Sequence, residues 1–335
     1  MNCPVKENRS KKLYTGSVFE GCRCGISVEG REMIRSLRQL SDLARENGPR
    51  TVAVLAPENE EFMAAVKEAH KQGFIDPLLI GDSKKMQQMA EKVEFDIAHF
   101  EIIPLHDKQQ ISDFGIQRLF SGGSSFASKG QIPTSFIYKS IIREEAKAKS
   151  GLTVSVICFW EIPEIDHLIA LTDTGVNIAP DVKAKEEILK NAVAVCRFLG
   201  YEKPKIAVLS AQRGIGGELQ SFRDYKKLRE NAARGVFGAC EILEATSFSE
   251  IFLQDTQRKV NTAGMPHILL VPSLDAGNII CKLDFFLNMK RSALVASSHG
   301  PVCIPSRSDD CEKIVNQLAM CVMLADMRIS YDVVE

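Results

Sequence analysis

Short apolar runs alternate with amphipathic stretches through the first half of this 335-residue chain. A short buried strand followed by a covering helix is the repeating unit of a parallel sheet, so this order predicts an α/β fold with helices on both faces of the sheet. Apolar spacing and helix-ending residues such as Gly48-Pro49 set the expected bounds. The expected helices are 29–47, 59–72, 83–92 and 108–120, and the expected strands are 51–55, 77–80 and 101–104.

The second half repeats this alternation with more antiparallel character. Two apolar runs, 152–159 and 167–171, are joined by a proline-containing turn and predict a hairpin-like pair. The other expected elements are helices 140–150, 182–199, 225–233, 276–288 and 311–327, strands 205–209, 268–271 and 293–296, and a glycine-rich loop at 214–217.

We expect two domains, because the Lys/Glu-rich helix at 140–150 marks a boundary and the chain returns to the first domain near Gly300. The first domain combines residues 51–148 with 300–335, so the last helix completes it. The second domain, residues 149–299, is an insertion. Residues 1–50 form an N-terminal extension and helix.

The composition excludes several classes of protein. Lys and Arg total 42 against 43 Asp and Glu, so no basic surface for nucleic acid is indicated. No apolar run reaches the ~18 residues of a membrane-spanning helix, and the polar N-terminus does not resemble a secretory signal. The ten cysteines, including Cys22 and Cys24, lack the paired spacing of a zinc site. We therefore expect a cytoplasmic protein with reduced thiols and no metal, acting on neither nucleic acid nor membrane.

A charged turn, Ser306-Arg307-Ser308-Asp309-Asp310, precedes the last expected helix. A helix start carries unpaired N–H groups and the positive end of the dipole, and an arginine there adds a cation. Such a cluster suits a phosphate dianion. Asp309 and Glu312 also have the spacing of a capping box, which would make the aspartates helix starters but leaves Arg307 unexplained. The turn predicts a phosphate site with proton-handling groups beside it.

Polar residues also follow earlier strands, where α/β proteins place ligands. Thr172, Asp173 and Asn177 lie between an expected strand and a helix, and turn capping is the alternative role for Asp173 and Asn177. Lys129-Gly130 follows a Gly-Gly loop and could hold an anion, or Lys129 could be an ordinary surface lysine.

The segment 271–278, VPSLDAGN, has the same strand-to-helix position. Gly277 would allow close backbone approach, Asn278 offers an amide, and Lys282 follows one turn later. Asp275 is equally well explained as a helix N-cap. No Walker, dinucleotide or nucleophile-elbow motif is present in the chain.

Three motifs in this order resemble the phosphotransacylase family, the phosphate acetyl- and butyryltransferases, with the butyryl type nearer. They are TDTGVNIAP (172–180), VPSLDAGN (271–278) and GPVCIPSRSDD (300–310), and the resemblance runs from about Thr51 to the end. It implies a reversible reaction of acyl-CoA with phosphate to give acyl phosphate and CoA. It also implies two α/β domains of the isocitrate/isopropylmalate dehydrogenase-like fold with the active site in the cleft between them, no permanently bound cofactor, and a homodimer or larger homo-oligomer.

For this chain, the resemblance implies that Arg307 binds the phosphate or acyl-phosphate oxygens. It also implies that Ser306 forms a hydrogen bond to the thiol or to the tetrahedral oxyanion. Asp309 matches the butyryl-type pattern and is the first candidate base, Asp310 is the second, and His299 is an outside candidate. Substrate and CoA would contact Lys129, Gly130, Thr172, Asp173, Asn177, Asp275, Gly277, Asn278, Lys282, Gly300 and Pro301.

Two departures from the family keep other functions open. Lys313 stands where acetyl-type enzymes have their aspartate base, and residues 241–251 lack the Asp-Gly-Pro-Leu turn of the butyryl type. The main alternative is a catalytically weak protein that binds or senses CoA or acyl-CoA. A metal-dependent dehydrogenase of similar shape is a third hypothesis, but it needs clustered carboxylates that the motifs do not supply.

Overall fold

The computed structural model describes residues 32–211, 219–254, 259–260, 264–287 and 289–329. The expected loop at 214–217, Cys22, Cys24 and most of the expected N-terminal extension lie outside these ranges. No helix within them is long and apolar enough to cross a membrane.

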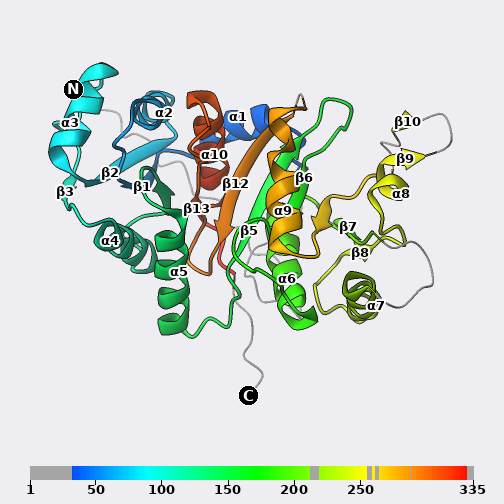
Figure 1. Cartoon of the computed structure of the whole chain (residues 1–335). Coiled ribbons are helices and arrows are strands. Elements are labelled where there is room, and N and C mark those ends of the chain that lie inside the picture. The colour runs from blue at the N-terminus through cyan, green and yellow to red at the C-terminus, as the bar shows by residue number, and fades with distance from the viewer. Residues whose placement is uncertain (1–31, 212–218, 255–258, 261–263, 288, 330–335) are drawn as a thin grey trace, which may run out of the picture.

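Eleven strands of the described chain form one mixed sheet in the order β3-β2-β1-β4-β13-β12-β5-β6-β11-β7-β8 (Figure 1). The bounds are β1 Arg50–Leu55, β2 Ile75–Gly81, β3 Ile102–Pro104, β4 Phe126–Lys129, β5 Ser155–Glu161, β6 Ile169–Thr172, β7 Lys205–Val208, β8 Glu241–Ile242, β11 Ile268–Leu270, β12 Lys290–Ala296 and β13 Val302–Cys303. A separate antiparallel pair joins β9, Leu253–Gln254, to β10, Lys259–Val260.

The directions of the strands divide the sheet. Strands β1 to β4, β13 and β5 run one way, and β12, β6, β11, β7 and β8 run the other way. The carboxyl ends of β4 and β13 therefore share one edge of the sheet, whereas those of β6 and β11 share the opposite edge. This division decides which motifs can meet.

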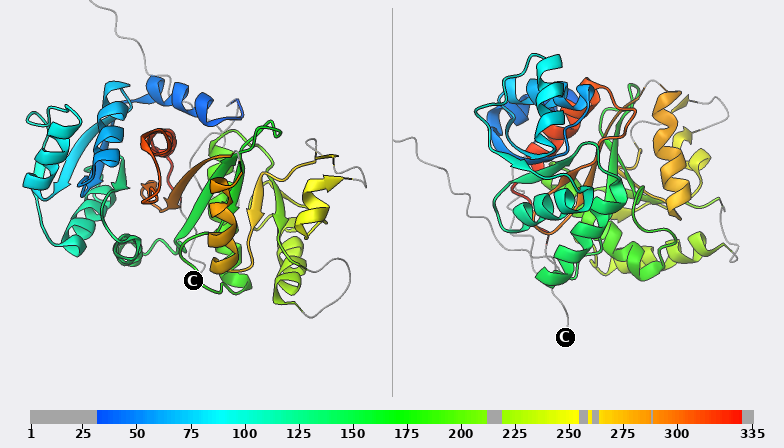
Figure 2. Two further views of the ribbon diagram at one scale, coloured as in Figure 1. Left: turned by 45° about the horizontal axis from the view of Figure 1, so that its top comes forward. Right: turned by 60° about the vertical axis from the view of Figure 1, so that its left-hand side comes forward.

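Helices cover the sheet on both sides (Figures 1 and 2). Their bounds are α1 Leu37–Asn47, α2 Glu60–Lys71, α3 Ser83–Lys92, α4 Lys108–Phe120, α5 Thr134–Ala148, α6 Val182–Phe198, α7 Gln220–Ala233, α8 Phe248–Phe252, α9 Leu274–Cys281 and α10 Cys311–Leu324, with a 3-10 turn η1 at Lys282–Phe285. The last helix, α10, packs against α1, α2 and β12. On another face, α9 covers a small apolar cluster that includes Cys158, Trp160 and Leu269.

The expected α/β fold with a mixed sheet is confirmed, and the pair 152–159 and 167–171 appears as the antiparallel strands β5 and β6. Four helix starts were wrong, and the helices expected at 140–150 and 225–233 begin earlier, at Thr134 and Gln220. The helix expected from Glu29 begins at Leu37, because the Ser36 side chain caps it by accepting from the Gln39 N–H. The helix expected at 276–288 begins at Leu274 and ends at Cys281, with Ser273 as its N-cap, so Asp275 is not the cap.

Candidate functional site

The turn between β13 and α10 meets the end of β4 at one edge of the sheet. Strands β4 and β13 pair in parallel, with Cys303 opposite Ser128, so Lys129 and the Ser306–Arg307 turn leave the sheet side by side. Together they border a small hollow of about 20 Å³. Its lining residues are Asn59, Phe62, Lys129, Gly130, Gln131, Pro305, Ser306, Arg307, Asp309 and Ile314.

Two cations at this hollow lack acidic partners. Lys129 is only 5% exposed, and its Nζ makes one long contact of 3.5 Å, to the Gly130 carbonyl. Arg307 is exposed and makes no hydrogen bond or ion pair with a residue that the structure describes. Burial lowers the pKa of Lys129, and the charge of Arg307 lowers it further, against the opposing effect of Asp309. Two cations that line one hollow, neither in an ion pair with a described carboxylate, favour an anionic ligand.

The backbone also fits closely at this point. A Cβ on Gly130 would lie 2.3 Å from the Ala56 carbonyl oxygen, so a side chain there would push β4 away from β1. Helix α2 begins at the same hollow, where its N-cap Asn59 accepts from the Phe62 N–H. A helix N-terminus adds positive potential for an anion.

Asp309 holds the turn rather than facing the hollow as a free carboxylate. It is buried, and its Oδ1 accepts from Arg291 Nη2 at 2.6 Å. Its Oδ2 accepts from the Ser306 N–H at 2.8 Å and from Gln317 Nε2 at 2.9 Å. By accepting these three hydrogen bonds, Asp309 ties the Ser306 backbone to β12 and α10.

Arg291 is the centre of a buried ion triad that the sequence did not reveal. Besides Asp309, it contacts Asp284 of η1 through Nε at 2.7 Å. Burial alone would lower the pKa of Arg291, but Asp309 and Asp284 hold it above its ordinary value. Arg291 was not predicted as a site residue, because a single arginine at the start of a strand is usually exposed to solvent.

The capping box expected from Asp309 and Glu312 is wrong. Asp310 is the N-cap of α10 and accepts from the Lys313 N–H at 2.9 Å, which leaves Asp309 free to turn inward. The Ser306 hydroxyl stays at the rim of the hollow, 3.0 Å from the hydroxyl of Ser308.

A second group of expected residues gathers around Asp173. Its Oδ1 accepts from the Val156 and Gly175 N–H groups, and its Oδ2 accepts from Asn177 N and Nδ2. The buried Asp173 carboxylate therefore shapes the loop that follows Thr172, the last residue of β6.

Helix α9 packs directly on this loop. The Asn278 side chain donates to the Thr174 carbonyl at 3.3 Å, and a Cβ on Gly277 would lie 2.5 Å from the Asp173 carbonyl oxygen. The motifs at 172–180 and 271–278 are thus in contact. Asp275 and Lys282, by contrast, are exposed and lie away from it.

Asp173 and Arg307 follow strands that leave the sheet at opposite edges. The last residue of β6, Thr172, and the last residue of β13, Cys303, lie at the same level of the sheet. Thr172 pairs with Ile157 of β5, Ile157 pairs with Leu294 of β12, and Leu294 pairs with Cys303. From there, β6 and β13 run to opposite edges. Helix α5 spans the interval, because it begins just after Gln131 and its Tyr138 reaches the Asp173 loop. Burial, and secondarily the Asp173 charge, raise the pKa of the Tyr138 phenol.

Three other expected residues lie at the far end of β13. Gly300 and Pro301 precede this strand, whereas Ser306 follows it. A Cβ on Gly300 would lie 2.8 Å from the Ser125 carbonyl oxygen, at a φ of +135° that favours glycine. His299 stacks on Phe120 with ring centroids 4.4 Å apart. These positions separate all three residues from the hollow.

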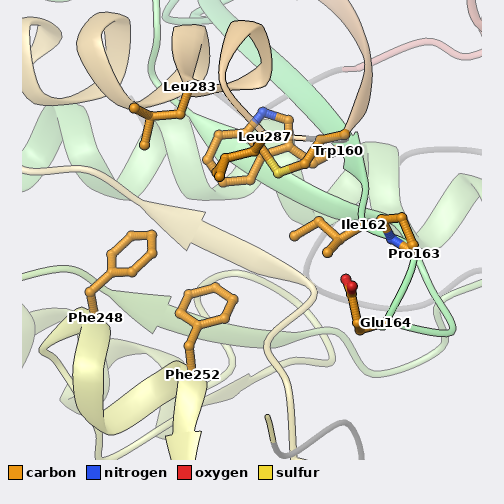
Figure 3. Close-up of a pocket in the computed structure, with 9 residues that line it drawn as sticks. Trp160, Ile162, Pro163, Glu164, Phe248, Phe252, Leu283 and Leu287 are labelled. Atoms are coloured by element: carbon orange, nitrogen blue, oxygen red, sulfur yellow. The ribbon is translucent and has the colours of Figure 1, made fainter. Parts of the chain in front are cut away.

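A larger, apolar hollow of about 370 Å³ lies beside η1 and contains none of the expected site residues (Figure 3). Its lining residues are Trp160, Ile162, Pro163, Glu164, Phe248, Phe252, Leu283, Leu287 and Met289. Phe248 and Phe252 come from α8, which begins within the segment 241–251 that departs from the butyryl pattern. No group of three or more metal-ligating side chains occurs in the part of the chain that the structure describes.

This geometry defines an α/β protein in which two cationic side chains, Lys129 and Arg307, line a small hollow at one edge of the sheet. Residues 131–322 match the model of the family described as phosphate acetyl/butaryl transferase, and the chain belongs to this family. It is 27% identical over 299 residues to phosphate butyryltransferase of Clostridium acetobutylicum, covering 88% of this chain and 99% of that protein.

Other similar proteins have names of the same kind. Phosphate acetyltransferase of Rhizobium meliloti is 25% identical over 287 residues, covering 84% of this chain and 90% of that protein. The fold resembles the crystal structure of a branched-chain phosphotransacylase from Enterococcus faecalis V583, with a TM-score of 0.69 and 23% identity over 83% of this chain and 99% of that one.

Proposed function

We propose that this chain transfers an acyl group between CoA and inorganic phosphate, with the phosphate held in the hollow between Lys129 and Arg307. The observation that carries the proposal is the meeting of these two cations, neither paired with a carboxylate of the described chain, at the Ser306 hydroxyl. The names of the relatives support the same reaction.

The reaction balances without an added cofactor. A phosphate oxygen of HPO₄²⁻ attacks the thioester carbonyl carbon, the carbonyl becomes a tetrahedral oxyanion, and the carbon–sulfur bond then breaks. The proton released by the attacking phosphate goes to the thiolate of CoA. The products are acyl phosphate and CoA thiol, so acyl-CoA and phosphate are the only reactants needed.

Each residue at the hollow has a role in this scheme. Arg307 and Lys129 bind and orient the phosphate, which turns a bimolecular encounter into an aligned attack. The Ser306 hydroxyl donates to the oxyanion or to the departing sulfur. Asp309 is a positioning residue, because it accepts hydrogen bonds from Arg291, from Gln317 and from the Ser306 backbone, which it thereby fixes. Asp310 caps α10 and takes no part in proton transfer.

The binding or sensing alternative is favoured by one observation, which is that neither Asp309 nor Asp310 is placed as a free base. Phosphate is itself the nucleophile and carries the proton that the thiolate needs, so we favour catalysis.

Several further features belong to this proposal. We propose the isocitrate/isopropylmalate dehydrogenase-like fold, with residues 51–148 and 300–335 as one domain and 149–299 as the other. The packing of α10 against α2 supports this division. The Asp173 and Asn278 region would contact the CoA part of the substrate across the cleft, whereas Asp275 and Lys282 would not. We also propose a homo-oligomer without a resident cofactor.

A thiol-release assay over a series of acyl-CoAs tests the proposal. We expect CoA release that depends on phosphate and that EDTA does not change. A protein that binds acyl-CoA without phosphate-dependent release would support the sensing alternative, and loss of activity in EDTA, restored by a divalent ion, would support the dehydrogenase-like hypothesis.

Lys129 should make phosphate binding sensitive to alkaline pH. Because burial and Arg307 lower its pKa, Lys129 loses its charge at a lower pH than the ~10.4 of a free lysine. We therefore expect the KM for phosphate to rise with increasing pH before the pH reaches the ~10.4 at which a free lysine titrates. Lys129→Arg should abolish this rise, since a guanidinium stays charged throughout. An equal rise in both proteins would remove Lys129 from the phosphate site.

A further inference from the structure

Two lysines of the described chain are deeply buried, and they differ in what surrounds them. Lys185 is 3% exposed, and its Nζ lies 2.6 Å from Oδ2 of Asp224. Lys129 is 5% exposed, and among the described residues its Nζ makes one long contact of 3.5 Å, to the Gly130 carbonyl oxygen. A buried amine beside a carboxylate stays an ammonium ion, whereas a buried amine without one loses its proton more readily.

Burial and a neighbouring cation are two conditions that make a lysine nucleophilic, because both favour the neutral amine with its free lone pair. Lys129 meets both conditions, since it lines the same hollow as Arg307. Burial is the largest cause of the lowered pKa of Lys129, and the Arg307 charge lowers it further, against the opposing effects of Cys303 and Asp309. The hollow therefore holds an amine nucleophile as well as groups that attract an anion.

We propose that Lys129 is a self-acylation site, at which an acyl phosphate bound in the hollow transfers its acyl group to the lysine amine. The inference rests on the proposed function, because that reaction forms the acyl phosphate. A single bridging oxygen separates the phosphorus of an acyl phosphate from its carbonyl carbon. A phosphoryl group held by Arg307 beside Ser306 therefore brings this carbon close to the amine of Lys129.

The acylation step balances without a further reactant. The lone pair of the neutral Lys129 Nζ attacks the carbonyl carbon, the bond from that carbon to the bridging oxygen breaks, and phosphate departs. The proton that the nitrogen loses goes to the departing phosphate, so the products are an N-acyl lysine and HPO₄²⁻. An amide is far more stable than an acyl phosphate, so the modified lysine does not pass the acyl group on to CoA. Acylation of Lys129 thus ends turnover and is not a step of it.

Acylation changes the hollow in two ways. It removes the positive charge of Lys129, and it places an acyl group where phosphate would bind. Both changes weaken the binding of phosphate. The protein then loses transfer activity as acyl phosphate accumulates, which makes Lys129 a site of inhibition by the product. Lys185 does not react, because its amine is paired with Asp224.

Incubation of the full chain with synthetic acetyl phosphate, without CoA, tests the proposal. Peptide mass spectrometry should show acetylation of Lys129 about tenfold or more faster than that of Lys84, an exposed lysine of α3, with Lys185 unmodified. Inorganic phosphate should slow the acetylation of Lys129 but not that of Lys84, because phosphate occupies the hollow. Equal rates at Lys129 and Lys84, or a Lys129 rate that phosphate leaves unchanged, would overturn the proposal.

Two variants connect the modification to activity. Lys129→Arg has no amine at this position, so its transfer rate, whatever its starting value, should not decline during the incubation with acetyl phosphate. Lys84→Arg is the matched control, and its rate should decline as that of the original protein does. If the rate of Lys129→Arg fell as fast as that of the original protein, the inhibition would not arise at Lys129 and the proposal would be wrong.

The incubation separates this inference from the proposed function, because the acyl phosphate is supplied rather than made by the protein. Acyl transfer between CoA and phosphate by a protein whose Lys129 stays unmodified in acetyl phosphate would overturn self-acylation alone. Rapid acetylation of Lys129 in a protein that shows no such transfer would overturn the proposed function alone.

Discussion

Arg307→Ala is expected to lower the rate of acyl transfer by about a hundredfold or more while leaving the thermal midpoint nearly unchanged. The arginine is exposed, it has no partner among the described residues, and it stands three residues before the N-cap of α10, so the fold does not depend on it. In the reaction it would hold the phosphate and the charge that develops on it, a contribution of about 3 kcal/mol to transition-state stabilisation. Steady-state kinetics with saturating acyl-CoA measures the loss.

Arg307→Lys separates the charge from the geometry. An ammonium keeps the positive charge but cannot form the bidentate contact of a guanidinium, so we expect only partial recovery of the rate. Arg234→Ala, at an exposed arginine that is the C-cap of α7, is the matched control and should keep the full rate. Near-normal transfer by Arg307→Ala at low phosphate would show that the phosphate binds elsewhere.

Arg291→Met is expected to lower the free energy of unfolding by about 3–5 kcal/mol. Methionine keeps much of the volume but leaves the buried carboxylates of Asp284 and Asp309 facing each other without the cation between them. Urea denaturation monitored by circular dichroism gives the change. Removing one member of a buried ion group leaves uncompensated charge, which costs more than the group itself contributes.

The comparison variant for Arg291 is Arg229→Ala, at an exposed arginine that pairs with Glu244. An exposed pair of this kind contributes less than about 1 kcal/mol, so this variant should unfold close to the original protein. If Arg291→Met were equally stable, the buried triad would not hold the Ser306 turn, and Asp309 would regain its place as a candidate base.

The alternation of strands and helices could be predicted from the sequence, because it depends on the spacing of apolar residues close together in the chain. The helices expected at 108–120 and 182–199 had clear apolar faces and clear ends, and both lie where expected. Strand β4 was missed because four residues that include Ser128 and Lys129 carry no hydrophobic alternation, and β13 was missed because it has only two residues. Their pairing with longer neighbours makes them strands, and no local signal carries that information.

The candidate site was likewise predicted only in part. Residue type and position indicated Ser306, Arg307 and Lys129-Gly130, which the fold brings to one hollow. The role of Asp309 could not be predicted from the turn alone. It depends on Arg291 of β12 and on Gln317 of α10, which lie outside the turn. The separation of Asp173 from Arg307 depends on the opposite directions of β6 and β13, which a single sequence does not specify.

The measurement that tests the central claim most directly is phosphorus NMR of the protein mixed with inorganic phosphate and a short-chain acyl-CoA. If the hollow between Lys129 and Arg307 serves phosphate as the acyl acceptor, a new acyl phosphate resonance will grow in equal amount to the free CoA thiol, and both will form about a hundredfold or more slowly in Arg307→Ala. Thiol release without an acyl phosphate, or an acyl phosphate formed equally well by Arg307→Ala, would contradict this account.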